Sequence, residues 1–252
     1  MDLGLSNRVI MVTGGSGSIG RATALAFGSE GSRVAVTFKQ NEASADQVVT
    51  EIKAVGGDAI AVPLDLSDSN SISAALKTVT QTWKSLDVLV NNAVAWPEQS
   101  WPPGFATISP QQWRETLRVN LEGVIELTQA ALPSLLADGF GRVVSLSSGV
   151  VEYGMPGEEV YAAAKSGLIG FTRCLAREVG SQGVLANVVM PGLTLTDRSV
   201  QQVPENIRKV VAEQAPSGRL STPQDVASTV LFLGSRANAN ITGEIVRVSG
   251  GN

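Results

Sequence analysis

Histidine is absent from the 252-residue chain, and cysteine occurs only once, at Cys174. Without histidine, neither a Ser-His-Asp nor a Cys-His nucleophilic system can be assembled. A zinc site built from cysteine and histidine is excluded for the same reason, so we predict no metal site. A single cysteine cannot form an internal disulfide, which suits a reducing compartment.

Dense basic runs and long apolar runs are also missing. The formal net charge is −4, so we expect no sequence-independent binding of nucleic acid. The first seven residues contain no basic stretch followed by a long apolar one, and the longest apolar runs, such as 226–233, are far too short to span a bilayer. We therefore expect a cytoplasmic protein with neither nucleic-acid nor membrane partners.

Glycine, by contrast, is abundant, with 26 residues, and hydrophobic residues make up 43% of the chain. Short apolar runs alternate with segments of helical periodicity, and no change in composition marks a domain boundary. The expected strands lie at 8–14, 34–38, 59–64, 87–91, 142–147, 184–190 and 244–248; the expected helices lie at 19–30, 42–55, 69–83, 110–136, 160–180 and 223–233. This pattern predicts one α/β domain over residues 1–252, with a doubly wound, seven-stranded parallel sheet and helices on both faces.

The segment Thr13-Gly-Gly-Ser-Gly-Ser-Ile-Gly20 joins the first expected strand to the first helix. Glycines allow the backbone to approach a phosphate, and a helix N-terminus offers free N–H groups and the positive end of a dipole. Arg21-Ala22 follows where a P-loop requires Lys-Ser/Thr, so this is not a P-loop. The position between strand and helix favours a nucleotide site over an ordinary glycine-rich turn.

A second pattern places Tyr161 and Lys165 four residues apart on an expected helix. Residues i and i+4 share one helix face, so the ammonium is expected near the phenol and should lower its pKa. Alone, such a pair is more often a solvated helix face. Ser148, at the end of an expected strand thirteen residues upstream, adds a hydroxyl that could polarise a carbonyl.

Further short motifs follow in a fixed order along the chain: Asp65-Leu66, Asn91-Asn92-Ala93, Asn120, Ser147-Ser148, Pro191-Gly192, Gly218-Arg-Leu, Ile241-Thr-Gly and Ser249-Gly-Gly251. With the two patterns above, they make the chain resemble the single-domain short-chain dehydrogenase/reductases over essentially its whole length. The resemblance implies a Rossmann-type sheet and an NADP(H)- or NAD(H)-dependent oxidoreductase.

Carried over residue by residue, the resemblance assigns Tyr161 as proton donor to the substrate carbonyl and Ser148 as hydrogen-bond donor to the same oxygen. Lys165 would lower the Tyr161 pKa and hold the nicotinamide ribose. Asn120 would position a water between Lys165 and solvent; a purely structural role, in which it only distorts its helix, is the less favoured alternative.

The resemblance also implies a set of nucleotide contacts running from the glycine-rich loop to the segment after the sixth strand. These residues are Gly14, Ser16, Ser18, Ile19, Gly20, Phe38, Lys39, Asp65, Leu66, Asn92, Ala93, Tyr161, Lys165, Pro191, Gly192 and Thr194. Three positions depart from the usual family pattern: Ser18 and Val94 each replace a glycine, and Ser249 replaces an aspartate.

The end of the second expected strand bears on the choice of cofactor. NAD-type sites place Asp or Glu there, on the ribose 2′-hydroxyl, whereas this chain has Phe38 followed by Lys39. With no carboxylate to repel a 2′-phosphate and a cation to meet it, we predict NADP(H) rather than NAD(H). Lys39 as a merely solvated strand-end residue remains the alternative.

The expected substrate pocket includes Val94, Trp96, Trp101 and Met155, and the aromatic-rich segment 94–109 follows the fourth strand. Such walls suit a flat apolar ligand, although packing of the tryptophans in the core is as good an interpretation. Residues 137–139 and 181–183, where family members that dock acyl carrier protein have cations, contain none. We therefore expect reduction of a free, bulky, hydrophobic ketone, such as a polycyclic polyketide-type compound.

Other functions are compatible with the same motifs. A 3-oxoacyl-(acyl-carrier-protein) reductase is the first alternative. An epimerase or dehydratase usually has a larger C-terminal domain, and a nucleotide-sensing regulator usually lacks the catalytic tyrosine or lysine. Family analogy also implies a homo-oligomer, a dimer or tetramer, built through the long helices 110–136 and 160–180.

Overall fold

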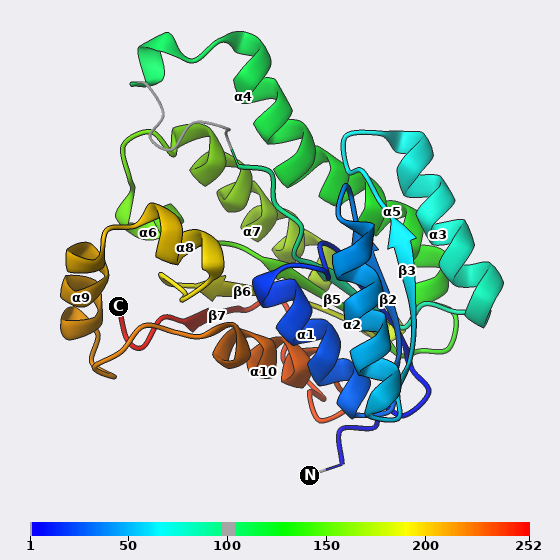
Figure 1. The fold of residues 1–252 in the computed structure, drawn as a ribbon. Coiled ribbons are helices and arrows are strands. Elements are labelled where there is room, and N and C mark those ends of the chain that lie inside the picture. Colours follow the sequence, from blue (N-terminus) through cyan, green and yellow to red (C-terminus); the bar gives the residue numbers. More distant parts are fainter. Residues whose placement is uncertain (1, 97–103) are drawn as a thin grey trace.

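The computed structural model of the protein describes residues 2–96 and 104–252. Seven parallel strands form one sheet in the order β3-β2-β1-β4-β5-β6-β7, with the helices on both faces (Figure 1). The doubly wound, Rossmann-type prediction is confirmed. The strand order reverses between β1 and β4, and open α/β sheets bind ligands in the crevice at such a switch point.

The elements agree closely with the alternation predicted from the sequence. The strands are β1 (Val9–Val12), β2 (Arg33–Phe38), β3 (Asp58–Pro63), β4 (Val88–Asn91), β5 (Gly141–Leu146), β6 (Val184–Pro191) and β7 (Ile245–Val248). The helices are α1 (Ser18–Ser29), α2 (Glu42–Ala54), α3 (Ser69–Trp83), α4 (Pro110–Leu117), α5 (Gly123–Leu135), α6 (Val150–Tyr153), α7 (Glu159–Val179), α8 (Asp197–Gln202), α9 (Glu205–Gln214) and α10 (Pro223–Leu233).

Helices bury both faces of the sheet, and successive residues of a strand point to opposite faces. In β1, Ile10 and Val12 pack in the same cluster as residues of α1, α2 and α10, whereas Val9 and Met11 pack with α3, α5 and α7. A strand that is apolar on both faces reads as a continuous apolar run, which is the pattern seen in the sequence.

The predicted single helix over 110–136 is wrong. α4 ends at Leu117, a π turn occupies Arg118–Glu122, and α5 continues from Gly123. Inside the π turn, the Asn120 side chain donates from Nδ2 to the Thr116 carbonyl at 2.9 Å. The side chain thus bonds the carbonyl four residues back, which the backbone would bond in a continuous helix, and π turns of this kind are frequent at functional sites.

The segments that follow the strand ends carry the smaller helices α6, α8 and α9, which lie together on the left of Figure 1. The sequence predicted only an irregular loop-helix region before residue 215, and the structure resolves it into α8 and α9. Over residues 2–96 and 104–252, no helix has the length and apolarity needed to cross a membrane. The same residues contain no group of three or more Asp, Glu, Cys or His side chains able to hold a metal ion.

Candidate active site

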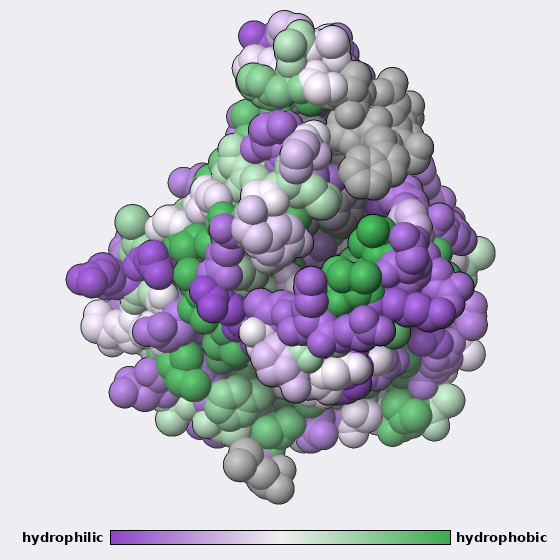
Figure 2. All heavy atoms as spheres, turned by 90° about the vertical axis from the view of Figure 1, so that its left-hand side faces the viewer, coloured by the Kyte–Doolittle hydropathy of each residue, from purple (hydrophilic) through white to green (hydrophobic). Residues whose placement is uncertain are grey.

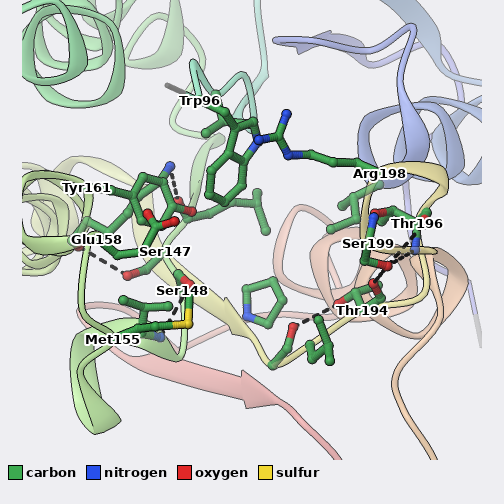
Figure 3. Close-up of a pocket in the computed structure, with 18 of the residues that line it drawn as sticks. Trp96, Ser147, Ser148, Met155, Glu158, Tyr161, Thr194, Thr196, Arg198 and Ser199 are labelled. Atoms are coloured by element: carbon green, nitrogen blue, oxygen red, sulfur yellow. Dashed lines mark hydrogen bonds between the residues drawn. The ribbon is translucent and has the colours of Figure 1, made fainter. Parts of the chain in front are cut away.

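The end of β5 and the buried face of α7 bring Ser148, Tyr161 and Lys165 to one cavity (Figure 3). Ser147, the first residue after β5, donates from its hydroxyl to the Lys165 carbonyl at 3.1 Å and so links the strand end to the helix. Tyr161 and Lys165 are both buried, as expected for residues i and i+4 on one face. The spacing therefore predicted their common location correctly.

Lys165 is a fully buried cation at the base of this group. Its ammonium donates to the Leu146 carbonyl at 2.9 Å and lies 5.7 Å from the centroid of the Tyr161 ring. Burial disfavours the charged form and lowers the pKa of Lys165 to about 8. Near neutral pH the side chain can thus both hold and release a proton.

The predicted lowering of the Tyr161 pKa is wrong in this structure. Burial raises the pKa of the phenol above its ordinary value, and the opposing hydrogen bond with Ser148 and the charge of Arg198 do not compensate. The sequence argument counted the nearby cation but could not count desolvation, which is larger here. As a result, Tyr161 keeps its proton at neutral pH.

Asn120 is fully buried, and its side chain bonds backbone groups. Its Nδ2 atom donates to the Ala95 carbonyl at 2.9 Å as well as to Thr116, and its Oδ1 accepts from the Ala95 N–H at 3.2 Å. Asn120 therefore fastens the segment after β4 to the π turn. The sequence anticipated a helix distortion at this residue, and the structure adds the contact with Ala95.

The glycine-rich loop is held against β4 by side chains from both sides. Thr13 accepts the N–H groups of Asn92 and Ala93 at 2.8 and 2.9 Å, and Asn92 donates to the Thr13 carbonyl at 2.8 Å. A Cβ at Gly20 would lie 2.1 Å from the Gly14 carbonyl oxygen, so only glycine fits there. Asn92, predicted to flank the adenosine ribose, is thus also bonded to the loop itself.

Ser18 begins α1 with a φ of 20°, a left-handed value that glycine adopts more easily. This is the position where related loops commonly have glycine. Gly17, the N-cap of α1, has open space around the place of a Cβ. The serine therefore keeps the turn that glycine normally makes at some cost in backbone strain.

The end of β2 places Lys39 beside Asp65, with 2.8 Å between Nζ and Oδ2. The expectation that no carboxylate lies at this position is wrong, because β2 and β3 are parallel neighbours and their ends meet at one edge of the sheet. Partial burial would raise the pKa of Asp65, but bonds from Lys39 and Ser67 hold it below its usual value. More than half of the Lys39 side chain is exposed.

The cavity has a volume of about 300 Å³. Its lining includes many of the residues predicted for substrate or nucleotide: Ile19, Asn92, Val94, Trp96, Ser148, Met155, Tyr161, Lys165, Pro191, Gly192 and Thr194. Trp101 lies outside the described residues. The other predicted nucleotide contacts are absent from this lining and lie on the glycine-rich loop or at the ends of β2, β3 and β4.

Trp96 is a wall of the cavity and not a core residue. Its ring lies 4.6 Å from the Tyr161 ring at an interplanar angle of 31°, and 36% of the residue is exposed. The guanidinium of Arg198 lies on Trp96, 4.8 Å from the ring centroid. Of the two interpretations of the aromatic segment, core packing is therefore wrong for this residue.

Sequence reasoning missed several further residues of the cavity, among them Tyr153, Glu158 and Arg198. Glu158 precedes Tyr161 by three residues, which places it one turn away on the same helix, and this spacing could have revealed it. Arg198 could not have been found in this way, because it comes from α8 and reaches the cavity only through the folding of the segment after β6.

The chain was compared with protein-family models and with curated proteins. A model described as Enoyl-(Acyl carrier protein) reductase matches residues 14–252. The 3-oxoacyl-(acyl-carrier-protein) reductase FabG of Staphylococcus aureus is 36% identical over 241 residues, covering 96% of both chains. The corresponding enzyme of Aquifex aeolicus is 38% identical over 252 residues, covering 100% of this chain and 99% of the relative. The chain belongs to the short-chain dehydrogenase/reductase family.

Solved structures agree with this assignment. A 7α-hydroxysteroid dehydrogenase complexed with NADH and 7-oxo glycochenodeoxycholic acid has a TM-score of 0.93 and 29% identity, covering 100% of this chain and 96% of the other. A dehydrogenase/reductase from Sinorhizobium meliloti has a TM-score of 0.91 and 31% identity, covering 99% and 96%. The chain is an oxidoreductase of the ketoreductase-like group in this family, whose members use nicotinamide cofactors.

The residues of the chain fit such a nucleotide. Among the described residues, no side chain caps the N-terminus of α1, and its first turn carries no acidic residue. The unbonded N–H groups there can meet a pyrophosphate, at the β1–β4 switch point where the loop of Gly14 and Gly20 comes close to β4. Ile19, which belongs to that turn, also lines the cavity of Tyr161.

Proposed function

We propose that the chain reduces a ketone to a secondary alcohol, with Tyr161 as the proton donor to the carbonyl oxygen. The observation that carries the proposal is a buried, protonated phenol that faces the cavity next to Ser148 and close to Lys165. Ser148 donates a hydrogen bond to the same oxygen and stabilises the negative charge that develops on it. A bound nicotinamide dinucleotide supplies the hydride.

Lys165 restores the proton that Tyr161 gives away. Its lowered pKa of about 8 makes the ammonium a better proton donor than an ordinary lysine. Asn120 holds the Ala95 backbone, and we propose that it also positions the water that connects Lys165 to solvent. The hydroxyl of Ser148 needs no such supply, because it only donates a hydrogen bond.

For the cofactor we propose NADP(H) in preference to NAD(H). Lys39 follows β2, is more than half exposed, and offers a cation to a 2′-phosphate. The adjacent Asp65 moderates this preference, because the ion pair must rearrange before Lys39 can bond a phosphate. The steroid dehydrogenase described above is complexed with NADH, so NAD(H) is the alternative cofactor.

Replacing Lys39 with alanine is expected to raise the Michaelis constant for NADPH by about one to two orders of magnitude, because a hydrogen bond to a charged group contributes about 1.5–3 kcal/mol. The constant for NADH should change far less, and steady-state kinetics with both nucleotides measures the two. Lys53→Ala, on the exposed side of α2, is the matched control. Equal effects on both nucleotides would mean that Lys39 does not meet the phosphate.

For the substrate we propose a free, bulky and largely apolar ketone. Val94, Trp96, Tyr153 and Met155 form an apolar wall around Tyr161, and all four are partly exposed. Figure 2 shows the face with α6, α8 and α9, where both hydrophobic and hydrophilic side chains border a central hollow. Rigid aromatic walls favour a flat ligand.

A 3-oxoacyl chain on acyl carrier protein is the second candidate, because the curated relatives named above carry that activity in their names. Against it stands the absence of a cation at Gly139 and Gln182 in the turns before β5 and β6. These turns lie close together, since the Gly141 N–H donates to the Gly183 carbonyl at 3.2 Å. Arg236 nearby, 5.2 Å from the Phe140 ring, provides one cation for an acidic partner.

The two candidates are separated by a direct comparison of kcat/KM on a polycyclic aromatic ketone and on a carrier-tethered 3-oxoacyl chain. The free ketone is expected to react at least about tenfold faster, because apolar walls bind it and the acidic carrier finds little complementary charge. Adding cations with Ala137→Arg, at an exposed position of the same turn as Gly139, and with Gln182→Arg should raise the rate on the tethered chain only. Faster reduction of the tethered chain by the wild-type protein would establish the second candidate.

We also propose that the chain forms a homo-oligomer through α5 and α7. On α7, the exposed residues Ala163, Ser166 and Gly170 recur at helical spacing and form a smooth face of small side chains. Small residues let two helices approach closely. Analytical ultracentrifugation at micromolar concentration measures the assembly, and a purely monomeric chain would contradict the proposal.

A further inference from the structure

Glu158 stands at the N-cap of α7, where a carboxylate commonly accepts hydrogen bonds from the first-turn N–H groups. Its side chain makes no such bond. The Oε2 atom is buried, has no hydrogen-bond partner in the part of the chain that the structure describes, and belongs to a residue that lines the Tyr161 cavity. A partly buried carboxylate without a donor is costly. A turn about its last bond brings either oxygen to the cavity that the residue lines, so the carboxylate is placed to accept a hydrogen bond from a bound molecule.

The charged neighbours of Glu158 do not provide that donor. Burial raises the pKa of the carboxyl, the charge of Arg198 opposes this, and the exposed carboxylate of Glu159 adds to it. No described salt bridge joins Arg198 to Glu158, because the guanidinium lies on the ring of Trp96. Figure 3 shows Glu158 and Arg198 on opposite sides of the cavity, with Trp96 between them.

We propose that the Glu158 carboxylate is a specificity-determining group that accepts a hydrogen bond from a hydroxyl or ammonium group of the substrate. The inference rests on ketone reduction at Tyr161 and narrows its substrate class to hydroxyketones and aminoketones. Glu158 precedes Tyr161 by three residues on one helix, a rise of roughly 5 Å. We therefore expect the hydroxyl or ammonium group to lie only a few bonds from the carbonyl that Tyr161 protonates.

Other substituents fit this position less well. A plain hydrocarbon leaves Oε2 without a partner, and sites built to bond a hydroxyl discriminate strongly against analogues that lack it. A carboxylate on the substrate meets the negative charge of Glu158 in a partly desolvated cavity. The guanidinium of Arg198 cannot offset this repulsion, because it is stacked on Trp96 and lies across the cavity from Glu158.

The test uses a bicyclic aryl ketone and three analogues that carry a hydroxyl, an aminomethyl or a carboxyl group three bonds from the carbonyl carbon. The ratio of kcat/KM for each analogue to that for the parent is measured in the wild type, Glu158→Met, Glu158→Gln and Glu159→Gln. A ratio cancels any general loss of activity or folding. Glu159→Gln is the matched control, since its carboxylate is exposed and bonded to the Gly157 N–H.

In the wild type and in Glu159→Gln, the hydroxyl and aminomethyl analogues are expected to exceed the parent by about tenfold or more, because the acceptor is charged. Glu158→Met should bring both ratios to within about twofold of one. Glu158→Gln should keep part of the preference for the hydroxyl, through its carbonyl, and lose that for the ammonium. The carboxyl analogue should fall below the parent unless Glu158 is replaced.

Binding of the same ketones, measured by calorimetry without turnover, separates this inference from the proposed reaction. Donor-dependent binding that disappears in Glu158→Met, with no ketone reduced, would contradict ketone reduction and support the inference. Reduction with ratios near one, ratios that survive Glu158→Met, or preference for the carboxyl analogue would overturn the inference and leave ketone reduction standing. Equal binding of all four ketones would overturn it as well.

Discussion

Replacing Tyr161 with phenylalanine is expected to lower the turnover number for ketone reduction by about two to four orders of magnitude, because the carbonyl oxygen loses its proton donor. The chain has no histidine to take over this role. Nucleotide affinity should remain nearly unchanged, since the phenylalanine ring keeps the contact with Trp96. Single-turnover rates and nucleotide fluorescence titrations measure the two quantities.

The second tyrosine of the chain provides a matched control. Tyr153 also lines the cavity, but 66% of it is exposed, and its hydroxyl has no place in the proposed proton transfer. Tyr153→Phe removes the same oxygen and should keep most of the turnover. If Tyr161→Phe retained more than about a tenth of wild-type turnover, Tyr161 would not be the proton donor.

Replacing Lys165 with methionine is expected to lower turnover by about two to three orders of magnitude, because the phenolate left on Tyr161 is no longer reprotonated efficiently. Methionine is of similar length and is uncharged, so the buried site stays filled. The exposed Lys77→Met on α3 changes the same charge outside the cavity and serves as the control. Turnover within about threefold of the wild type would contradict the role of Lys165.

Lys165→Met should lower turnover but not stability, because the buried ammonium is itself unfavourable. Burial lowers the pKa of Lys165 from 10.5 to about 8. Between about pH 8 and 10.5, the folded chain therefore binds fewer protons at this residue than the unfolded chain does. Below pH 8 the shift lowers the free energy of unfolding by about 3 kcal/mol. The cost disappears as the pH rises above that range. Lys165→Met removes it at every pH.

Urea denaturation of the wild type and Lys165→Met between pH 7 and 10 measures this effect. The wild type is expected to gain stability relative to the variant as the pH rises, and the variant should be at least as stable as the wild type at pH 7. A constant difference across the range would mean that Lys165 has an ordinary pKa in the folded chain.

The alternation of apolar runs and helical segments was sufficient to predict the sheet, because each parallel strand that is buried on both faces is a short continuous run of apolar residues. The same held for Tyr161 and Lys165, whose spacing on one helix places them on a common face whatever surrounds them. The family motifs extended this to Ser148 and the glycine-rich loop. Local spacing failed inside residues 110–136, where one side chain, Asn120, replaces a backbone bond and splits the helix.

Properties that depend on burial or on distant segments were decided only by the packed chain. Spacing alone gave the wrong direction for the Tyr161 pKa, because the desolvation of a side chain depends on every element packed around it. The ion pair of Lys39 with Asp65 and the stacking of Arg198 on Trp96 join residues from different strand ends. The unpartnered Glu158 carboxylate likewise exists only because α8 and the segment after β4 close the cavity around it.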